Sequence, residues 1–206
     1  MGTYLGDPTG AVDDRYRAAL IEGLESGANL VDTAANYRCG RSERVVGEAL
    51  RDAPVDRESV VVATKGGFLP FDGEPPDDPS AYVRERFVEQ GIVDPGDLAN
   101  GAHAMTPDYL DWSLDRSLNR LGLDAVDCYY VHNPETQLAV RSRADVYDSL
   151  EAAFETLERR RAAGDIGAYG VATWDAFRAP ADADGRLSLA EALTRAEAAG
   201  EAVGPD

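Results

Sequence analysis

The sequence contains few of the residues that define several common classes of protein. It has two cysteines, Cys39 and Cys128, in 206 residues. Two are too few for a disulfide framework or a zinc site, and they are typical of a reducing cytoplasm. No apolar run approaches the roughly 18 residues needed to span a bilayer, and residues 1–10 lack the pattern of a signal peptide. We therefore expect a cytoplasmic protein without a membrane segment.

Positive charge is also scarce. Asp and Glu total 38 against 20 Lys and Arg, which gives a net charge of -18. A surface of this kind repels nucleic acid and anionic membranes, so we expect neither as a partner. The acidic residues are spread along the chain rather than gathered in a tail, which indicates a solvated folded surface. This pattern is typical of a halophilic cytoplasmic protein, and it predicts that stability rises between low salt and molar KCl.

Lysine is the rarest charged residue. The chain has 19 arginines and a single lysine, Lys65. A GC-rich genome would explain the arginine bias, but it would not explain why one lysine remains. A lysine ammonium can shift its pKa and can act as a point charge or an amine nucleophile, which a guanidinium cannot do. Lys65 is therefore a candidate site residue.

Short apolar runs alternate with amphipathic helical segments. We expect strands at residues 2–5, 29–33, 60–64, 125–131 and 166–172. We expect helices over residues 13–26, after a cap at Ser42, from Thr106 to Gly122, up to Gly164, and after a capping box of Ser188 and Glu191. Five βα repeats predict one α/β domain with a parallel sheet across residues 1–206. Periodicity alone does not separate a barrel from a doubly wound open sheet. No G-x-G-x-x-G follows the first strand, which disfavours the dinucleotide-binding form of the open sheet.

Residues 66–104 interrupt this alternation. The segment is far longer than an ordinary βα connection, contains five prolines and includes one plausible short helix at 81–89. A long insertion at the carboxyl end of a strand often contributes to substrate access. A surface decoration that tolerates salt is an equal alternative, and the sequence does not decide between them.

Four chemically capable side chains follow three successive strands. Asp32, Lys65 and His132 come at or just after expected strand ends, and Tyr37 lies in the loop after the second strand. Each alone has a structural explanation, such as loop capping or packing. Because active sites of parallel α/β folds lie at the carboxyl ends of strands, their common placement predicts an active site. With only two histidines and no H-E-x-x-H, a metal site is not expected, and His103 is interpreted as an ordinary loop residue.

Five motifs in order resemble those of the aldo-keto reductase family. Asp32–Tyr37 followed by Gly40–Glu43 resembles the signature after that family's second strand. The other four similar segments are Gly2–Gly6, Val62–Lys65, Tyr129–His132 and Ile166–Trp174, which resemble its first, third, fourth and fifth strands. The resemblance covers residues 2–174. It implies a TIM (β/α)8 barrel, here as an incomplete barrel of about five βα units.

The resemblance also implies an activity, the NADP(H)-dependent reduction of an aldehyde or ketone to an alcohol. Tyr37 would be the general acid, and a nearby ammonium of Lys65 would lower the pKa of its phenol, which is about 10 when free. Asp32 would hold Lys65, and His132 would donate a hydrogen bond to the oxygen of a small carbonyl substrate. The resemblance further assigns cofactor binding to Thr3, Tyr4, Asp32 and Thr173, and substrate binding to Tyr4, Asn133 and Trp174.

The sequence departs from the family in two places. The sixth to eighth βα units, which bind much of the cofactor in the family, have no counterpart here, so we expect a truncated domain. At the fifth strand this chain has Ala172 and Thr173, where family members usually have Ser-Asn to hold the nicotinamide amide. An open barrel edge would also favour self-association or pairing with a complementing chain.

Two other functions remain open. The chain could be a non-catalytic or regulatory relative that lacks the cofactor-binding half. More remotely, it could be an aldolase that forms a Schiff base through Lys65, since such barrels also place a lysine at a strand end near an aspartate.

Overall fold

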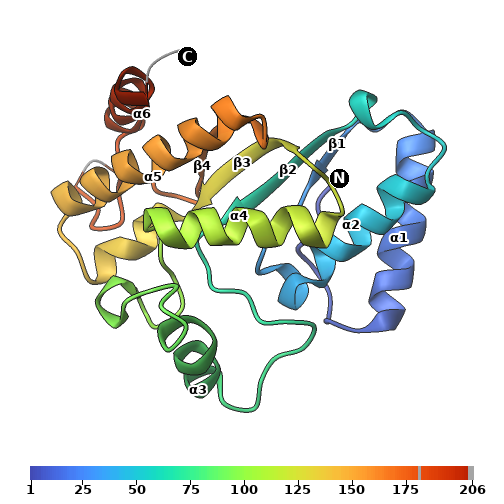
Figure 1. The fold of residues 1–206 in the computed structure, drawn as a ribbon, viewed down its shortest axis with the longest axis horizontal. Coiled ribbons are helices and arrows are strands. Elements are labelled where there is room, and N and C mark those ends of the chain that lie inside the picture. Colours follow the sequence, from blue (N-terminus) through green and yellow to red (C-terminus); the bar gives the residue numbers. More distant parts are fainter. Residues whose placement is uncertain (181, 204–206) are drawn as a thin grey trace.

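Four parallel strands form the sheet of the computed structural model, which describes residues 1–180 and 182–203 (Figure 1). They are β1 (Leu30–Asp32), β2 (Val61–Gly66), β3 (Val126–His132) and β4 (Ile166–Ala172), and each pairs with the next in chain order. Parallel neighbours joined by right-handed crossovers bring their carboxyl ends to one edge of the sheet. Asp32, Lys65 and His132 therefore lie at the same edge.

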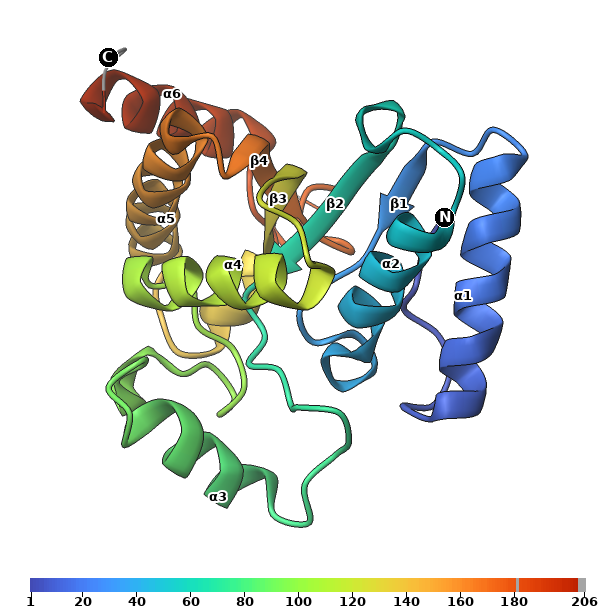
Figure 2. The same cartoon turned by 45° about the vertical axis from the view of Figure 1, so that its right-hand side comes forward.

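Five long helices accompany the strands. They are α1 (Gly10–Glu25), α2 (Arg41–Asp52), α4 (Pro107–Leu121), α5 (Arg143–Ala163) and α6 (Leu189–Val203). The expected ends of α4 and α5 are confirmed, since Gly122 and Gly164 follow them with left-handed backbone angles, φ 66° and 87°. Helix α6 packs on α5, as the rotated view shows (Figure 2). No described helix combines the length and the apolar character needed to cross a membrane.

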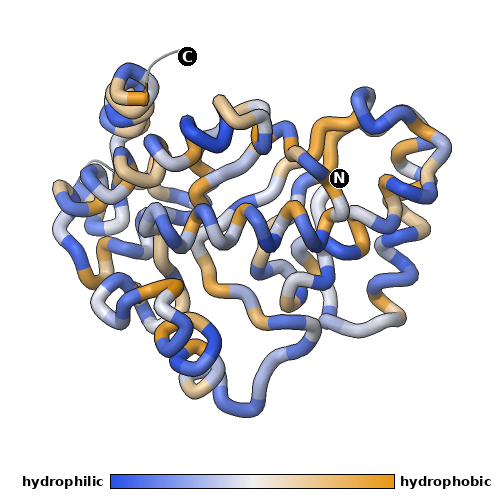
Figure 3. The backbone as a smooth tube through the Cα atoms, viewed as in Figure 1, coloured by the Kyte–Doolittle hydropathy of each residue, from blue (hydrophilic) through white to orange (hydrophobic). Residues whose placement is uncertain are grey.

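The core lies between the strands and their crossover helices. Leu110 and Leu114 of α4, Leu150 of α5 and Tyr129 of β3 are among its fully buried side chains. The tube coloured by hydropathy shows hydrophobic residues along the strands, whereas the outermost loop of the insertion is hydrophilic (Figure 3). Alternation of apolar runs and amphipathic helices thus produced a layered α/β core, as expected.

The expected first strand at residues 2–5 is reduced to one bridge. Gly2 pairs with Asp32 in parallel, Asp32 N–H donates to Met1 O at 2.7 Å, and Thr3 N–H donates to Asp32 O at 3.2 Å. The chain then turns away at Gly6, whose φ of 94° suits glycine. These two backbone hydrogen bonds help to hold the segment beside β1, but they do not make it a strand.

Two of the expected helix caps differ from the prediction. Helix α2 begins two residues early, with Gly40 rather than Ser42 as its cap, so Ser42 lies inside the helix, where its hydroxyl donates to Thr3 O at 2.7 Å. The capping box of α6 is half formed. Glu191 N–H donates to the Ser188 hydroxyl, but Ser188 N–H donates to the Tyr147 hydroxyl instead. In both places a tertiary partner has replaced the local one.

A buried ion pair joins α2, β2 and α4 behind the sheet edge. Glu43 is fully buried and accepts hydrogen bonds from Thr64 Oγ1 at 2.7 Å and from Arg120 at 3.3 Å. Arg120 also donates to Ala35 O at 3.3 Å. A charge buried in this way must keep its partner, because an unpaired one costs several kcal/mol, on the order of 3–5. The contact fixes β2 directly before Lys65.

The insertion at 66–104 forms its own layer below α4 in Figures 1 and 2. Its helix was expected at 81–89. The structure has α3 (Pro79–Val83), capped by Asp78, followed by a π-helical turn at Arg84–Val88. The segment returns to the sheet edge through His103, which bridges Phe68 and Ala99.

Candidate active site

The four side chains expected at the strand ends lie together. Lys65 Nζ donates to Asp32 Oδ1 at 2.7 Å and is 3.3 Å from the Tyr37 hydroxyl. The rings of Tyr37 and His132 meet edge to face with centroids 5.8 Å apart. Three strand ends and one loop thus place a carboxylate, an ammonium, a phenol and an imidazole at one point.

Tyr37 depends on a strained turn. The two residues after it, Arg38 and Cys39, have left-handed backbone angles, with φ of 50° and 59°. Such angles cost non-glycine residues about 1–3 kcal/mol and persist only where the surroundings impose them. Here the buried Arg38 guanidinium donates to Asp7 O at 3.1 Å and pairs with Asp13 of α1. The ion pair stabilises the strained backbone of the turn, and this backbone sets the position of the Tyr37 side chain.

Lys65 is enclosed at the site, with 6% of its surface exposed. Besides Asp32 and Tyr37, it contacts the Thr33 carbonyl oxygen, to which Nζ donates at 2.7 Å. Burial lowers the pKa of Lys65, and the Asp32 carboxylate opposes that change. The amine is thus held by three oxygen atoms in a fixed position.

The pKa of Tyr37 moves against the expectation from the sequence. Burial of the phenol raises this pKa to about 12, and electrostatic interactions with Asp32 and then Tyr4 contribute to the increase. The expectation was that the Lys65 ammonium, held in place by Asp32, would lower this pKa. In the structure that ammonium is paired with Asp32, so its field at the phenol is largely cancelled. Tyr37 is therefore a neutral phenol that can donate a hydrogen bond.

His132 is also neutral. Burial, with further contributions from Lys65 and His103, lowers its pKa to about 3. The side chain is 6% exposed, and among the described residues its Nδ1 has no hydrogen-bond partner. A neutral imidazole offers one N–H donor and one acceptor. It can therefore donate to a ligand oxygen without adding charge to the site.

His103 is the residue that the sequence interpretation missed. It is completely buried, its Nε2 lies 2.7 Å from the His132 carbonyl oxygen, and its Nδ1 lies 3.0 Å from Gln137 Nε2. The Phe68 ring contacts both imidazoles, at 5.0 and 5.3 Å between centroids. The insertion is thereby tied to the backbone of His132. A histidine in a long polar loop gives no periodic signal, so only the fold reveals this contact.

Tyr4 and Thr3 occupy different positions relative to the site. The Tyr4 ring lies 5.0 Å from that of Tyr37 and is 56% exposed, so it is open to a ligand. Thr3 is buried, and its hydroxyl donates to Asp32 O at 3.3 Å. Thr3 therefore supports the Asp32 segment.

The residues after β3 and β4 are less closely gathered. Asn133 follows His132 with a left-handed φ of 47°, and its N–H donates to Ala172 O. The Thr173 hydroxyl donates to Glu135 at 2.5 Å and accepts from Ala176 N–H at 3.1 Å. Trp174 is 65% exposed. Thr173 is thus occupied within its own turn, whereas the Trp174 ring is open.

Comparisons with known proteins point in one direction. The model of the aldo/keto reductase family matches residues 1–181. D-threo-aldose 1-dehydrogenase of a Pseudomonas species is 33% identical over 159 residues, 77% of this chain and 44% of that protein. NADH-specific methylglyoxal reductase of Escherichia coli is 29% identical over 157 residues, 76% of this chain and 40% of that protein. The chain thus spans less than half the length of these relatives.

One solved structure illustrates the similarity in three dimensions. An aldo-keto reductase from Klebsiella pneumoniae, crystallised in complex with NADPH, is 26% identical. It superimposes with a TM-score of 0.52 and covers 85% of this chain and 45% of that one.

Proposed function

Because the chain belongs to the aldo/keto reductase family, we propose that it takes part in the NADP(H)-dependent reduction of an aldehyde or ketone to an alcohol. The observation that carries this proposal is the contact of Lys65 with both Asp32 and Tyr37, next to neutral His132. A structural role for the Lys65–Asp32 ion pair would not explain why a phenol and an imidazole lie next to it.

The nicotinamide end of the cofactor fits the described residues. Thr33 Oγ1 and His132 Nδ1 are buried at the site without a described partner. The exposed rings of Tyr4 and Trp174 offer flat surfaces to a ring such as nicotinamide. We propose that these residues, with Asp32, hold that end of NADP(H). When bound, the cofactor supplies a hydride for the carbonyl carbon.

The protein's own groups would handle the carbonyl oxygen. His132 donates a hydrogen bond to it and fixes its position, and Tyr37 donates a second and then transfers its proton. The proton transfer leaves a phenolate, and Lys65 lies 3.3 Å from that oxygen to stabilise it. Asp32 keeps Lys65 in place. Because burial raises the pKa of Tyr37, the phenol keeps its proton at neutral pH and is available to donate it as negative charge develops on the substrate oxygen.

The substrate proposed is a small carbonyl compound. The Pseudomonas relative is named for an aldose and the Escherichia coli relative for methylglyoxal, and both compounds carry an aldehyde or its cyclic equivalent. Since the second relative is named as specific for NADH, both NADPH and NADH belong in the test.

Fluorescence titration of the purified chain with NADPH, then with NADH, tests the proposal in about 3 M KCl, where surface repulsion is screened. We expect saturable binding, followed by turnover of methylglyoxal or an aldose. Tyr37→Phe should lower turnover about 100-fold, because general acid catalysis is worth at least that much, and should leave cofactor affinity unchanged.

Tyr16→Phe is the matched control. The Tyr16 hydroxyl, on α1, donates to Leu5 O and makes no described hydrogen bond with the four site residues. Removing that hydroxyl should therefore leave turnover unchanged. A folded chain that binds neither cofactor would contradict the proposal for this chain. Equal turnover in the wild type and Tyr37→Phe would contradict the role of Tyr37.

Borohydride treatment with a ketone separates this function from the Schiff-base alternative. A Schiff base requires a free, neutral amine, whereas Lys65 Nζ is held by Asp32 and Thr33 O. We expect no ketone adduct on Lys65 in the intact mass. A stoichiometric adduct that Lys65→Arg abolishes would favour the aldolase.

A further inference from the structure

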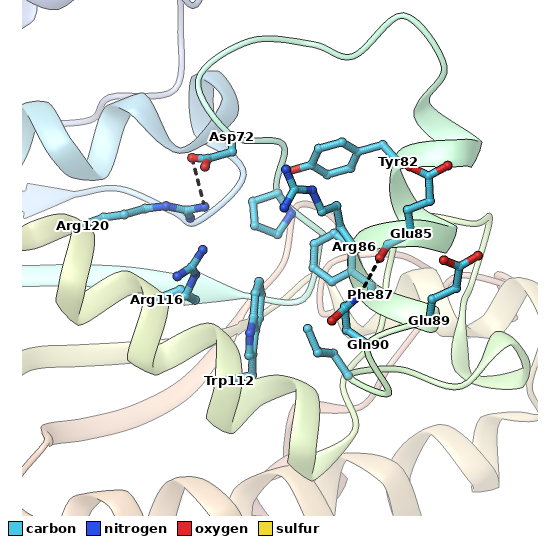
Figure 4. Close-up of a pocket in the computed structure, with 12 residues that line it drawn as sticks. Asp72, Tyr82, Glu85, Arg86, Phe87, Glu89, Gln90, Trp112, Arg116 and Arg120 are labelled. Carbon is cyan, nitrogen blue, oxygen red and sulfur yellow. Dashed lines mark hydrogen bonds and ion pairs between the residues drawn. The ribbon is translucent and has the colours of Figure 1, made fainter.

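A cavity of about 690 Å³ lies between α4 and the insertion (Figure 4). Trp112, Arg116 and Arg120 line it from successive turns of α4, and Tyr82 and Arg86 line it from the insertion. None of the four active-site residues borders it. It is therefore separate from the active site, and it is built partly by the segment whose role the sequence left open.

Arg86 and Arg116 are distinctive among the arginines. In the described part of the chain, every other arginine donates a hydrogen bond or ion pair from its guanidinium, and these two donate none. Carboxylates outnumber basic side chains by 38 to 20 in this protein. Partners for an arginine are therefore abundant, yet two arginines of one cavity lack them.

The carboxylates of the cavity are already paired. Asp72 is bound by Arg44 and lies 4.0 Å from Arg120, and the Arg44 guanidinium holds the pKa of Asp72 low. Glu85 and Glu89 both lie near Arg84, at 3.0 and 3.5 Å. Their direct ion-pair partners are thus arginines other than Arg86 and Arg116, although the charge of Arg116 also helps to lower the pKa of Asp72.

Aromatic rings hold the two arginines in place. The Arg116 guanidinium lies 5.7 Å from the centroid of the Trp112 ring, and that of Arg86 lies 5.9 Å from the Tyr82 centroid. A guanidinium held by its flat face keeps its N–H donors available at its edge. Planar forks of N–H donors match the oxygens of a phosphate group.

We propose that this cavity binds the phosphate group of a small organic ligand, with Arg86 and Arg116 as its donors. The proposal goes beyond the reductase function and does not rest on it, because the cavity and the active site share no residue. The half-buried rings of Tyr82 and Trp112 line the cavity beside the arginines, so the organic part of the ligand has apolar surface within reach.

Titration of the full chain with inorganic phosphate tests this site. The chain has two tryptophans, Trp112 and Trp174, so in a Trp174→Phe background the fluorescence reports on the cavity alone. We expect a saturable change with phosphate. Arg86→Gln and Arg116→Gln should each weaken binding about tenfold, because each removes charge-assisted hydrogen bonds, and affinity should fall as KCl is added.

Arg15→Gln is the matched control. Arg15 lies on α1, and its guanidinium donates to the Ala11 carbonyl oxygen rather than to a carboxylate. Its replacement by Gln removes the same unit of charge from the whole molecule as the two test substitutions do. It should bind phosphate as tightly as the parent. A folded parent without a saturable signal would overturn the proposal, and so would an equal loss in Arg15→Gln. Because the readout needs neither cofactor nor turnover, failure here leaves the reductase proposal standing, and the reverse also holds.

Discussion

At the scale of single residues, burial sets the charge states of the imidazoles. Both histidines of the described chain are enclosed, and burial lowers the pKa of His103 to about 4 and that of His132 to about 3. Each ring is thus held neutral by the fold, well below its usual value of 6.5. The polar contacts of His103 with Gln137 and His132 O depend on that neutral form.

Stability should therefore fall as the solution becomes acidic. The unfolded chain takes up protons near pH 6.5, whereas the folded histidines do so only near pH 4 and 3. The stability due to neutral His103 is fully present above pH 6.5 and is lost as the pH falls toward 4. His103→Gln, which keeps an N–H donor, should reduce the slope of unfolding free energy against pH in urea melts between about pH 7.5 and 5. An unchanged slope would contradict the assignment.

At the scale of elements, the insertion and β3 meet at a place that admits no side chain. A Cβ on Gly67 would lie 2.6 Å from the His132 carbonyl oxygen and 2.9 Å from His103 Nε2. Glycine is thus required where the end of β2 passes the two histidines. The close approach lets the insertion reach the active-site edge.

Gly67→Ala should lower the free energy of unfolding by about 2 kcal/mol, because the added methyl group must displace backbone. It should also lower any turnover, since His132 would move. Gly96→Ala, in the same insertion, meets nothing within 4 Å and should change stability by less than about 0.5 kcal/mol. Urea melts of the two variants make the comparison, and equal losses would contradict the close approach.

The same elements show what the sequence could and could not predict. Strand β4 has the expected bounds, and α4 and α5 end at the expected glycines, because apolar runs and glycine stops are local signals. The cap at Ser42 and the capping box at Ser188 were wrong in part, because Thr3 and Tyr147, distant in sequence, compete for their hydrogen bonds.

In the site, too, local sequence signals could be read, whereas contacts between distant segments could not. Residues at strand ends, such as Lys65, could be placed from the sequence because parallel strands share one edge. The raised pKa of Tyr37 could not, because it depends on how deeply the ring is buried and on Asp32 neutralising Lys65. His103 was missed for a similar reason, since its contacts cross from the insertion to β3.

At the scale of the whole molecule, charge dominates. With a net charge of -18, the repulsion between acidic side chains is stronger in the compact folded state than in an expanded chain. The ion pairs, such as Arg195 with Asp148 and Glu151, offset this only locally. The halophilic character inferred from the sequence stays a prediction with a direct test.

The melting temperature should rise steadily from low salt to about 3 M KCl, as screening at molar salt shortens the reach of charges to about 3 Å. Sucrose is the control, because it favours compact states by exclusion without screening charge. If sucrose and KCl raised the melting temperature alike, self-repulsion would not be what destabilises the molecule at low salt.

Having a single lysine gives the protein an unusual chemical label. Lys65 carries the chain's one ε-amine, and that amine is enclosed beneath Asp32, Thr33 and Tyr37. An amine-acylating reagent can reach it only when those contacts separate. The rate at which peptide mass mapping records acylation at Lys65, as distinct from the N-terminal amine, therefore measures how often the site opens, and a ligand that closes over Lys65 would slow that rate without any assay of catalysis.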